Sequence, residues 1–307
     1  MTVKIWFQEI RAPFLTLPLI CVLLSLAVAG LNGFFNPVYS FLTLFGVILL
    51  HVSVNVLNDY FDYKSGLDLS TKPTPFSGGS GILPKGDLNP THVFGLGLIS
   101  LIGGLTIGSY FVYIFNFDLV LILLIGVAAL SVLTYSSMLA SWGLGELIVG
   151  LNFGPLLFMG TYYVQSSTLS LEVILLGAIM GIFVSSILLI NEFPDHDADL
   201  KHGRKNLVVR LGSDNASKLF SLLLMTPYLL IVIRIIFSIL PIFTIIALIT
   251  IPKARFAIKH LSANRDKIPE LIPAMGTTVQ LTMFTGILLI VSYLAINFIN
   301  LPVPSLF

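Results

Sequence analysis

Asn58-Asp59-Tyr60-Phe61-Asp62 closes a long apolar run that extends over residues 38–57. A second stretch, Asn191-Glu192-Phe193-Pro194-Asp195, closes another apolar run over residues 170–190. Both stretches read Asn, acid, aromatic, any residue, Asp. Residues four apart share one face of a helix, so each Asn is expected to lie one turn from its Asp.

The acidic residues of the chain are concentrated around these two stretches. The windows 58–68 and 191–199 hold seven of the fifteen acidic residues, namely Asp59, Asp62, Asp68, Glu192, Asp195, Asp197 and Asp199. Carboxylates packed this closely repel one another unless a cation lies between them. Mg²⁺ prefers oxygen ligands and is commonly held by one or two carboxylates together with the phosphates of a substrate.

Two expected helix faces supply such ligands: Asn58 with Asp62, and Asn191, Asp195 and Asp199 at successive spacings of four. Basic residues that follow the second stretch, Lys201, Arg204 and Lys205, could meet a diphosphate directly. The residues alone therefore favour a clamp for a metal ion and a diphosphate. The acids could also be solvated loop ends of a transporter or channel, because buried acids mark ion pathways as well.

The composition places the chain in a lipid bilayer. Of its 307 residues 56% are apolar, only 10% are charged, and the mean hydropathy is +0.98, well above a typical soluble domain. The single cysteine, Cys21, excludes a disulfide framework. The net charge of +1 gives no reason to expect a nucleic-acid partner.

The apolar runs predict an all-α polytopic membrane protein with about nine transmembrane helices in a bundle around a central cavity. The predicted spans are residues 13–32, 38–57, 92–115, 118–138, 145–164, 170–190, 215–233, 235–251 and 276–299. Only Arg234 separates the seventh from the eighth, which makes that boundary the weakest one.

The basic residues alternate between the predicted loops. If the N-terminus is cytoplasmic, fifteen of the sixteen Lys and Arg residues lie inside and only Arg234 lies outside. This asymmetry predicts that both acidic windows face the cytoplasm, in a cell-membrane protein whose active-site loops are on that side. The windows follow the second and sixth spans, which suggests one domain, residues 1–307, with an internal pseudo-repeat (13–138 and 145–251) plus a last helix at 276–299.

Two other polar features of the chain each allow a functional interpretation and a purely structural one. The glycine-rich stretch Phe76-Ser77-Gly78-Gly79-Ser80-Gly81 could bring its backbone close to a phosphate, or it could be an ordinary linker. His51 and Asn55 precede Asp59 in the second span, and we treat His51 as a packing residue outside the metal set.

The two acidic motifs resemble those of a known family. Asn58-Asp59-Tyr60-Phe61-Asp62, followed by Asp68, is similar to the first aspartate-rich motif of the UbiA-type intramembrane prenyltransferases. Asp195-His196-Asp197-Ala198-Asp199 resembles the second, with Gly203-Arg204-Lys205-Asn206-Leu207 beside it. Arg11-Ala12-Pro13 is similar to an Arg-Pro element of the family, with an inserted Ala.

Within the superfamily, Leu144-Gly145-Glu146 and the stretch 160–165, with Gly78-Gly79-Ser80-Gly81-Ile82-Leu83, look most like the dihydroxynaphthoate prenyltransferases of menaquinone synthesis. One position departs from the family pattern. Several relatives have a basic residue in the loop after the fourth span, where this chain has Ser136, Ser137 and Met138.

The resemblance implies Mg²⁺-dependent transfer of a polyprenyl group from its diphosphate to an aromatic acceptor, 1,4-dihydroxy-2-naphthoate. The implied metal residues are Asn58, Asp59, Asp62, Asp68, Asp195 and Asp199. The implied diphosphate residues are Arg11, Asn58, Asn191, Lys201, Arg204 and Lys205. The implied catalytic residues are Asp62, Asp195, Asp199, Tyr135, Tyr162 and Glu146.

The aromatic faces of Tyr135, Phe158 and Tyr162 could stabilise an allylic cation, although aromatic residues in spans commonly serve packing alone. Glu146 could be a base or a hydrogen-bond partner for the acceptor, or simply a helix-end charge. Two alternatives stay open: the same chemistry on 4-hydroxybenzoate, a tetrapyrrole or a glycerol-phosphate ether lipid, and a cation-coupled transporter. A transporter should carry its acids near mid-bilayer on broken helices, whereas these lie at span ends.

Overall fold

The computed structural model describes residues 3–135 and 142–299, and within these ranges the chain is helical without a β-strand. Ser136, Ser137 and Met138, where the sequence departs from the family pattern, lie outside the described residues. In chain order the elements are α1 (Val3–Glu9), η1 (Ala12–Leu15), α2 (Thr16–Leu31), α3 (Pro37–Ser65), α4 (Ile82–Lys85), α5 (Pro90–Ile114), α6 (Leu119–Thr134), α7 (Gly145–Leu151), η3 (Asn152–Leu156), α8 (Leu157–Ser166), α9 (Leu171–Asn191), α10 (His196–Lys201), α11 (Leu207–Ile236), η4 (Ile242–Thr250), α12 (Ile251–Asn264) and α13 (Ile268–Ile299).

Side-chain caps define where several of the long helices begin. The Asn36 side chain accepts hydrogen bonds from the backbone N–H groups of Val38 and Tyr39, and Pro37 occupies the first helical position of α3. Asn89 caps α5 in the same way, ahead of Pro90. α3 ends at Ser65, and the capping residue after it, Gly66, adopts φ 81°, a left-handed conformation that glycine reaches without strain.

Within the described residues, seven helical segments are long and apolar enough to cross a membrane. They correspond to seven of the nine predicted spans. α6 is apolar but has only 16 residues, and the predicted span 235–251 is divided: α11 continues to Ile236, and the chain resumes after Pro241 as the 3₁₀ segment η4. The protein is a multi-pass membrane protein, while the count of nine and the cytoplasmic N-terminus stay predictions.

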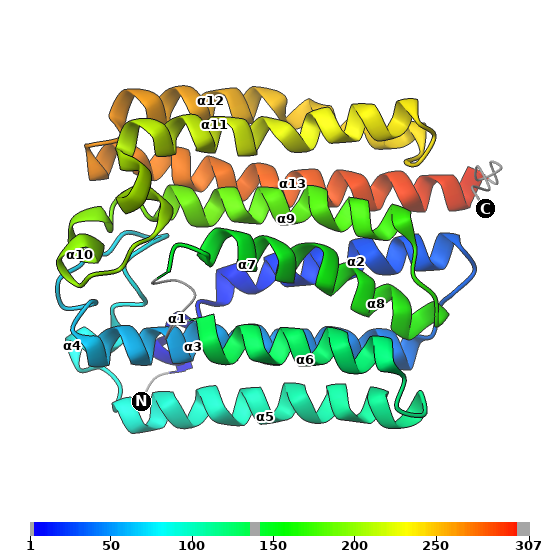
Figure 1. Ribbon diagram of the computed structural model, residues 1–307, viewed down its shortest axis with the longest axis horizontal. Coiled ribbons are helices and arrows are strands. Elements are labelled where there is room, and N and C mark those ends of the chain that lie inside the picture. The colour runs from blue at the N-terminus through cyan, green and yellow to red at the C-terminus, as the bar shows by residue number, and fades with distance from the viewer. Residues whose placement is uncertain (1–2, 136–141, 300–307) are drawn as a thin grey trace.

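The long helices run side by side, so that their ends gather at two opposite faces (Figure 1). One face carries α1, α4, α10 and the C-terminal end of α3. The other carries the connection from α5 to α6 and the end of α13 (Figure 1). Both acidic motifs therefore lie at the same end of the bundle, as the loop pattern predicts.

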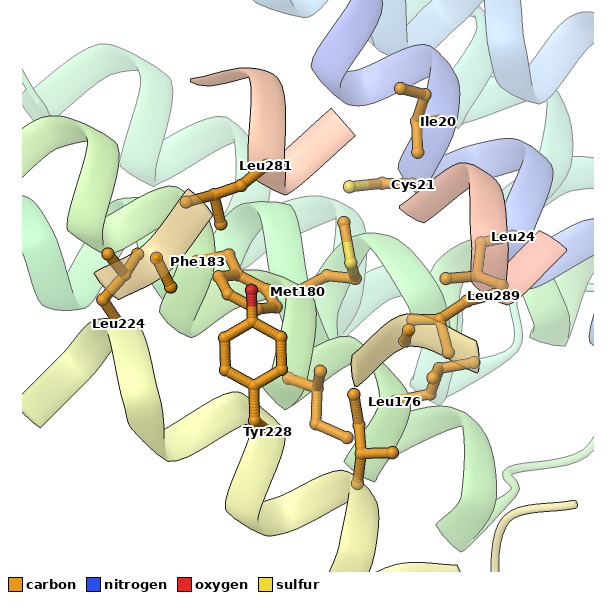
Figure 2. Close-up of a cluster of buried hydrophobic side chains, with 14 of the residues drawn as sticks. Ile20, Cys21, Leu24, Leu176, Met180, Phe183, Leu224, Tyr228, Leu281 and Leu289 are labelled. Carbon is orange, nitrogen blue, oxygen red and sulfur yellow. The ribbon is translucent and has the colours of Figure 1, made fainter. Parts of the chain in front are cut away.

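The core of the bundle forms around α9. Phe183 and Met180 of α9 pack with Tyr228 of α11, and the rings of Phe183 and Tyr228 meet edge to face with centroids 5.3 Å apart. Figure 2 shows this cluster between side chains of α2 and α13, such as Leu24 and Leu289.

The wall between this core and the rest of the bundle is a kinked span formed by α7, η3 and α8. The kink lies at Gly154, which has φ −100° and ψ −115°, followed by Pro155. A Cβ on Gly154 would lie 2.6 Å from the carbonyl oxygen of Gly177, so the absence of a side chain lets η3 approach the backbone of α9.

Candidate active site

The two acidic motifs meet at one pocket of about 120 Å³. Its walls come from the end of α3, the glycine-rich loop 76–79, the segment between α9 and α10, and the turn that precedes α11. Five carboxyl side chains line it: Asp62, Asp68, Glu192, Asp195 and Asp199. Two guanidinium groups, those of Arg11 and Arg204, line the same pocket.

The first motif lies inside α3, because this helix continues eight residues past the predicted span end to Ser65. Asn58 donates a hydrogen bond of 3.0 Å to Asp62 Oδ2, as their spacing predicts. The second motif is not a continuous helix. α9 ends at Asn191 and α10 begins at His196, so Asn191 and Asp199 do not share the expected helix face. Pro194 explains the break, because proline disfavours helical geometry in the residue before it.

Arg204 joins the two motifs. Its Nη2 donates to Asp62 Oδ1 at 3.0 Å and to Oδ2 at 3.3 Å, and its Nη1 lies 3.8 Å from Asp199 Oδ1. Burial alone would lower the pKa of Arg204, but the charges of Asp62 and Asp199 raise it above its usual range. The guanidinium therefore stays charged and offsets the repulsion between the two acids.

Asp195 and Asp199 are only partly matched by donors of the protein. The backbone N–H of Gly78 donates to Asp195 Oδ2 at 3.2 Å, and Asn206 Nδ2 donates to Asp199 Oδ2 at 2.6 Å. Burial raises the pKa of Asp195 to about 7 and that of Asp199 to about 6. The Oδ1 atom of each is buried without a hydrogen bond among the described residues.

These residues fit a divalent cation in chemistry, although they do not close around one. In the described part of the chain, no group of three or more His, Cys, Asp or Glu side chains stands close enough to hold an ion. The unmatched atoms are nevertheless the hard oxygens that Mg²⁺ prefers, and Asn191 Oδ1 is a third such atom. Buried acceptors without donors are rare in folded proteins, which indicates that a ligand supplies the missing charge.

Asp59, expected in the metal set, lies outside the polar pocket. Its Oδ1 accepts from Arg11 Nη2 at 2.9 Å and its Oδ2 from the backbone N–H of Ser80 at 2.8 Å. The Ser80 hydroxyl in turn donates to Glu9 Oε2 at 2.9 Å. Asp59 thereby fastens the N-terminal segment and the glycine-rich loop to α3. Asp68 does line the pocket, and burial followed by the charge of Asp59 raises its pKa to about 8.

The polar pocket opens into a larger, mostly apolar cavity of about 370 Å³ inside the bundle. Six of the described residues line both spaces and mark the junction: Arg11, Asn58, Phe76, Tyr135, Leu188 and Asn191. The apolar cavity extends between α3, α5 and α6 on one side and the kinked span on the other. The predicted central cavity is therefore present, with its charged end at the acidic motifs.

Of the remaining expected site residues, one lies at the junction of the two spaces and the others line neither space. Tyr135 lies at the junction, whereas Tyr162 lines neither space, because its hydroxyl accepts from Asn32 Nδ2 at 3.1 Å and its ring packs in the core. Glu146 is buried at the start of α7 and also lines neither space. Lys201 and Lys205 are exposed and do not line the pocket.

Sequence reasoning missed two residues that shape the pocket. Asn206 holds Asp199 while its Oδ1 also accepts from the backbone N–H of Val209, so one side chain caps α11 and orients an acid. An Asn ahead of a helical run is a cap signal, and that signal was present in the sequence. Glu192, which lines the pocket, was noted only as part of an acidic window; burial and the charge of Glu146 raise its pKa well above the usual range.

The arrangement defines a membrane-embedded protein that can hold a charged head group at the rim of the bundle and an apolar chain inside it. Comparison with known proteins gives the family. The model of the UbiA prenyltransferase family matches residues 18–271, and the chain belongs to this family. It is therefore a prenyltransferase, and the predicted resemblance is confirmed.

Curated relatives of similar length carry related names. A 2-carboxy-1,4-naphthoquinone phytyltransferase from Synechocystis sp. is 28% identical over 95% of this chain and 94% of its own. A 1,4-dihydroxy-2-naphthoate octaprenyltransferase from Escherichia coli is 26% identical over 93% of each chain. Among solved structures, a UbiA homolog from Archaeoglobus fulgidus bound to GPP and Mg²⁺ aligns with a TM-score of 0.62 and 15% identity, covering 94% of this chain and 99% of that one. This structural likeness supports the fold.

Proposed function

We propose that the protein transfers a polyprenyl group from a prenyl diphosphate to 1,4-dihydroxy-2-naphthoate, in a reaction that depends on Mg²⁺. One observation carries this proposal: an acid-lined pocket opens directly into an apolar cavity through shared residues such as Arg11 and Tyr135. A prenyl diphosphate has the same two parts, a highly charged head and an apolar tail. The two relatives named above act on naphthoate compounds by their names, which supports this acceptor.

Asp62, Asp195 and Asp199 would hold the Mg²⁺, and Asp68 lines the same pocket. When bound, the ion supplies Lewis acidity and offsets the charge that develops on the leaving diphosphate. Support comes from the unmatched Oδ1 atoms of Asp195 and Asp199, and from the structural neighbour that binds GPP together with Mg²⁺.

Arg204 and Arg11 then complete the head-group site. Arg204 already lies between the motifs, so a diphosphate entering the pocket meets its guanidinium as well as the metal. Asn58 and Asn191 stand at the junction, where they can hydrogen-bond the phosphate oxygen next to the prenyl carbon. Lys201 and Lys205 are exposed, which leaves them only a long-range attraction for the anionic substrate.

The chemistry would take place at the junction of the two spaces. The bond between the prenyl C1 and the diphosphate oxygen breaks, and the diphosphate leaves with the electron pair. The allylic cation faces the rings of Tyr135 and Phe76, which line both spaces and can stabilise a positive charge. The electron-rich acceptor ring forms the new carbon–carbon bond, and the ring becomes aromatic again as its carboxylate leaves as CO₂. The apolar walls keep water from the cation.

The acceptor is the finer part of the proposal, and the same site chemistry could serve 4-hydroxybenzoate, a tetrapyrrole or a glycerol-phosphate ether lipid. Purified protein should be incubated with Mg²⁺, labelled farnesyl diphosphate and a panel of these acceptors. We expect transfer to dihydroxynaphthoate in preference to 4-hydroxybenzoate, because a site built for one set of ring substituents discriminates against another. A preference for 4-hydroxybenzoate, or transfer to no aromatic acceptor, would refute the naphthoate assignment. Membership of a prenyltransferase family removes the support for a transporter.

We also propose that residues 1–307 form one domain with the pseudo-repeat 13–138 and 145–251, and that the acidic end faces the cytoplasm of a cell membrane. The charge asymmetry of the loops supports this orientation. Glu146, expected to meet the acceptor, and Tyr162, expected to face the allylic cation, both lie outside the cavity and the pocket, so the proposal gives neither a contact with substrate.

A further inference from the structure

His51 stands out among the residues that line the apolar cavity. It lies in the middle of α3, and its ring meets Phe153 of η3 edge to face with centroids 5.2 Å apart. The imidazole makes no hydrogen bond within the described residues, and its Nε2 atom is fully buried without a partner. A buried polar group without a partner destabilises the fold and is rare, so an unmatched imidazole on a cavity wall indicates that a ligand group meets it.

The position of His51 along α3 matches a substrate that reacts at the junction. His51, Asn58 and Asp62 all line the cavity or the polar pocket, at spacings of seven and four residues, and so share one face of the helix. At a rise of 1.5 Å per residue, His51 lies about 10 Å along the axis from Asn58. This is about the length of a bicyclic aromatic ring system with its substituents. A ring reaching from the junction to His51 would occupy the charged end of the cavity and leave its apolar end for the prenyl tail.

Arg11 also has an unmatched atom close to this wall, and it is held there by Asn55. Asn55, one turn after His51, donates to the backbone carbonyl of Ile10 at 3.1 Å and so holds the next residue, Arg11, against α3. Arg11 lines both spaces, and its Nε atom is buried without a hydrogen bond in the described part of the chain. One wall of the cavity therefore offers a cation at the junction and an imidazole deeper inside. This pattern suits an aromatic acid whose carboxylate points to the junction and whose hydroxyl points inward.

We propose that His51 binds a ring hydroxyl of the aromatic acceptor and, with Phe153, forms the acceptor subsite. A neutral imidazole nitrogen accepts the hydrogen bond from the hydroxyl, which orients the ring and raises its electron density without a proton being transferred. Phe153 of the kinked span packs edge to face against the imidazole and lines the same cavity. This inference rests on the proposed function, since it assigns a place to the acceptor of that reaction.

The test compares two naphthoates that differ only in one hydroxyl. The probes are 4-hydroxy-2-naphthoate, whose hydroxyl is too far from its carboxylate to bond to it, and 2-naphthoate, which has none. Binding to the purified protein is followed by naphthalene fluorescence. We expect His51→Leu to weaken binding of the hydroxylated probe roughly tenfold and to leave that of 2-naphthoate nearly unchanged. His51→Gln, which keeps a hydrogen-bonding group, should restore most of the loss.

Ser53→Ala is the matched control. Ser53 is on the same helix, and its Oγ is also buried without a hydrogen bond among the described residues, but it lines neither space. Its substitution should not change the ratio of the two affinities. Equal weakening of both probes in His51→Leu, or no weakening of either, would overturn the inference. Failure of the wild-type protein to prenylate any aromatic acceptor would instead refute the proposed function, which a separate turnover assay reports.

Discussion

Replacing Arg204 with Met tests whether this guanidinium takes the place of a metal cation between the two acidic motifs. The substitution removes the two contacts with Asp62, at 3.0 and 3.3 Å, and the 3.8 Å ion pair with Asp199. Both carboxylates are largely buried, with side-chain exposures of 13% and 4%. Removing one partner of a buried ion pair costs about 3–5 kcal/mol, and we expect the lower end because the pocket admits water.

A loss of about 3 kcal/mol corresponds to a fall of roughly 5 °C in the apparent melting temperature of a protein this large, because the entropy of unfolding grows with chain length. Thermal unfolding should therefore be measured on the detergent-purified variant and the wild type, in EDTA and in millimolar Mg²⁺. We expect the full destabilisation in EDTA and a smaller one in Mg²⁺, because an ion bound only by the folded state stabilises that state. Turnover should stay about 100- to 1,000-fold low even in Mg²⁺, since one donor to the developing diphosphate charge is missing.

Arg265→Met provides the control, because Arg265 also forms an ion pair, at 2.6 Å with Asp214, but in an exposed position. An exposed pair contributes about 0–1 kcal/mol, so this variant should melt near the wild type with and without Mg²⁺. If Arg204→Met melted at the wild-type temperature in EDTA, or if Mg²⁺ raised both melting temperatures equally, the bridging role of Arg204 would be refuted.

Three further predictions concern the metal, the tail and the topology. Asp195→Asn and Asp199→Asn should each abolish prenyl transfer at saturating Mg²⁺, and EDTA should abolish it reversibly in the wild type; full turnover in either variant removes that acid from the metal set. Gly160→Leu places a side chain in the apolar cavity, since a Cβ at Gly160 meets no atom within 4 Å. The KM should therefore rise more for a long-chain prenyl diphosphate than for a short one. An equal rise for both would contradict this position of the prenyl tail. Cysteines at the exposed positions Lys72 and Ser238 should react with an impermeant maleimide from opposite sides of sealed vesicles; labelling from one side only would refute the orientation.

The contacts that the sequence predicted well are those within one helical turn. The pairing of Asn58 with Asp62 follows from a spacing of four, and the continuous helix α3 preserves it. The corresponding prediction for Asn191 and Asp199 was wrong, because the chain turns between α9 and α10. A single Pro, at position 194, was the available signal of that turn.

Contacts between distant segments could not be obtained in this way. Arg204 meets Asp62 across 142 positions of the chain, and no local pattern specifies which acid a distant guanidinium reaches. The same holds for Tyr162. Its position along a span could be predicted, but whether its side chain points into the cavity or into the core depends on how α8 packs against α2. The pocket as a whole was predictable because both motifs end apolar runs on the same predicted side of the membrane.

The two acidic motifs differ in how many of their carboxylate oxygens accept a hydrogen bond from the protein. Every carboxylate oxygen of Asp59 and Asp62 accepts a hydrogen bond from the protein, through Arg11, Ser80, Asn58 and Arg204. In Asp195 and Asp199, by contrast, one oxygen is hydrogen-bonded and the other is buried without a hydrogen bond among the described residues. For Asp199 Oδ1 the nearest cation is Arg204 Nη1, at 3.8 Å. Charged oxygens that are satisfied gain little from a new cation, whereas unmatched ones gain the most. The second motif is therefore the side on which an added cation would offset the larger electrostatic cost.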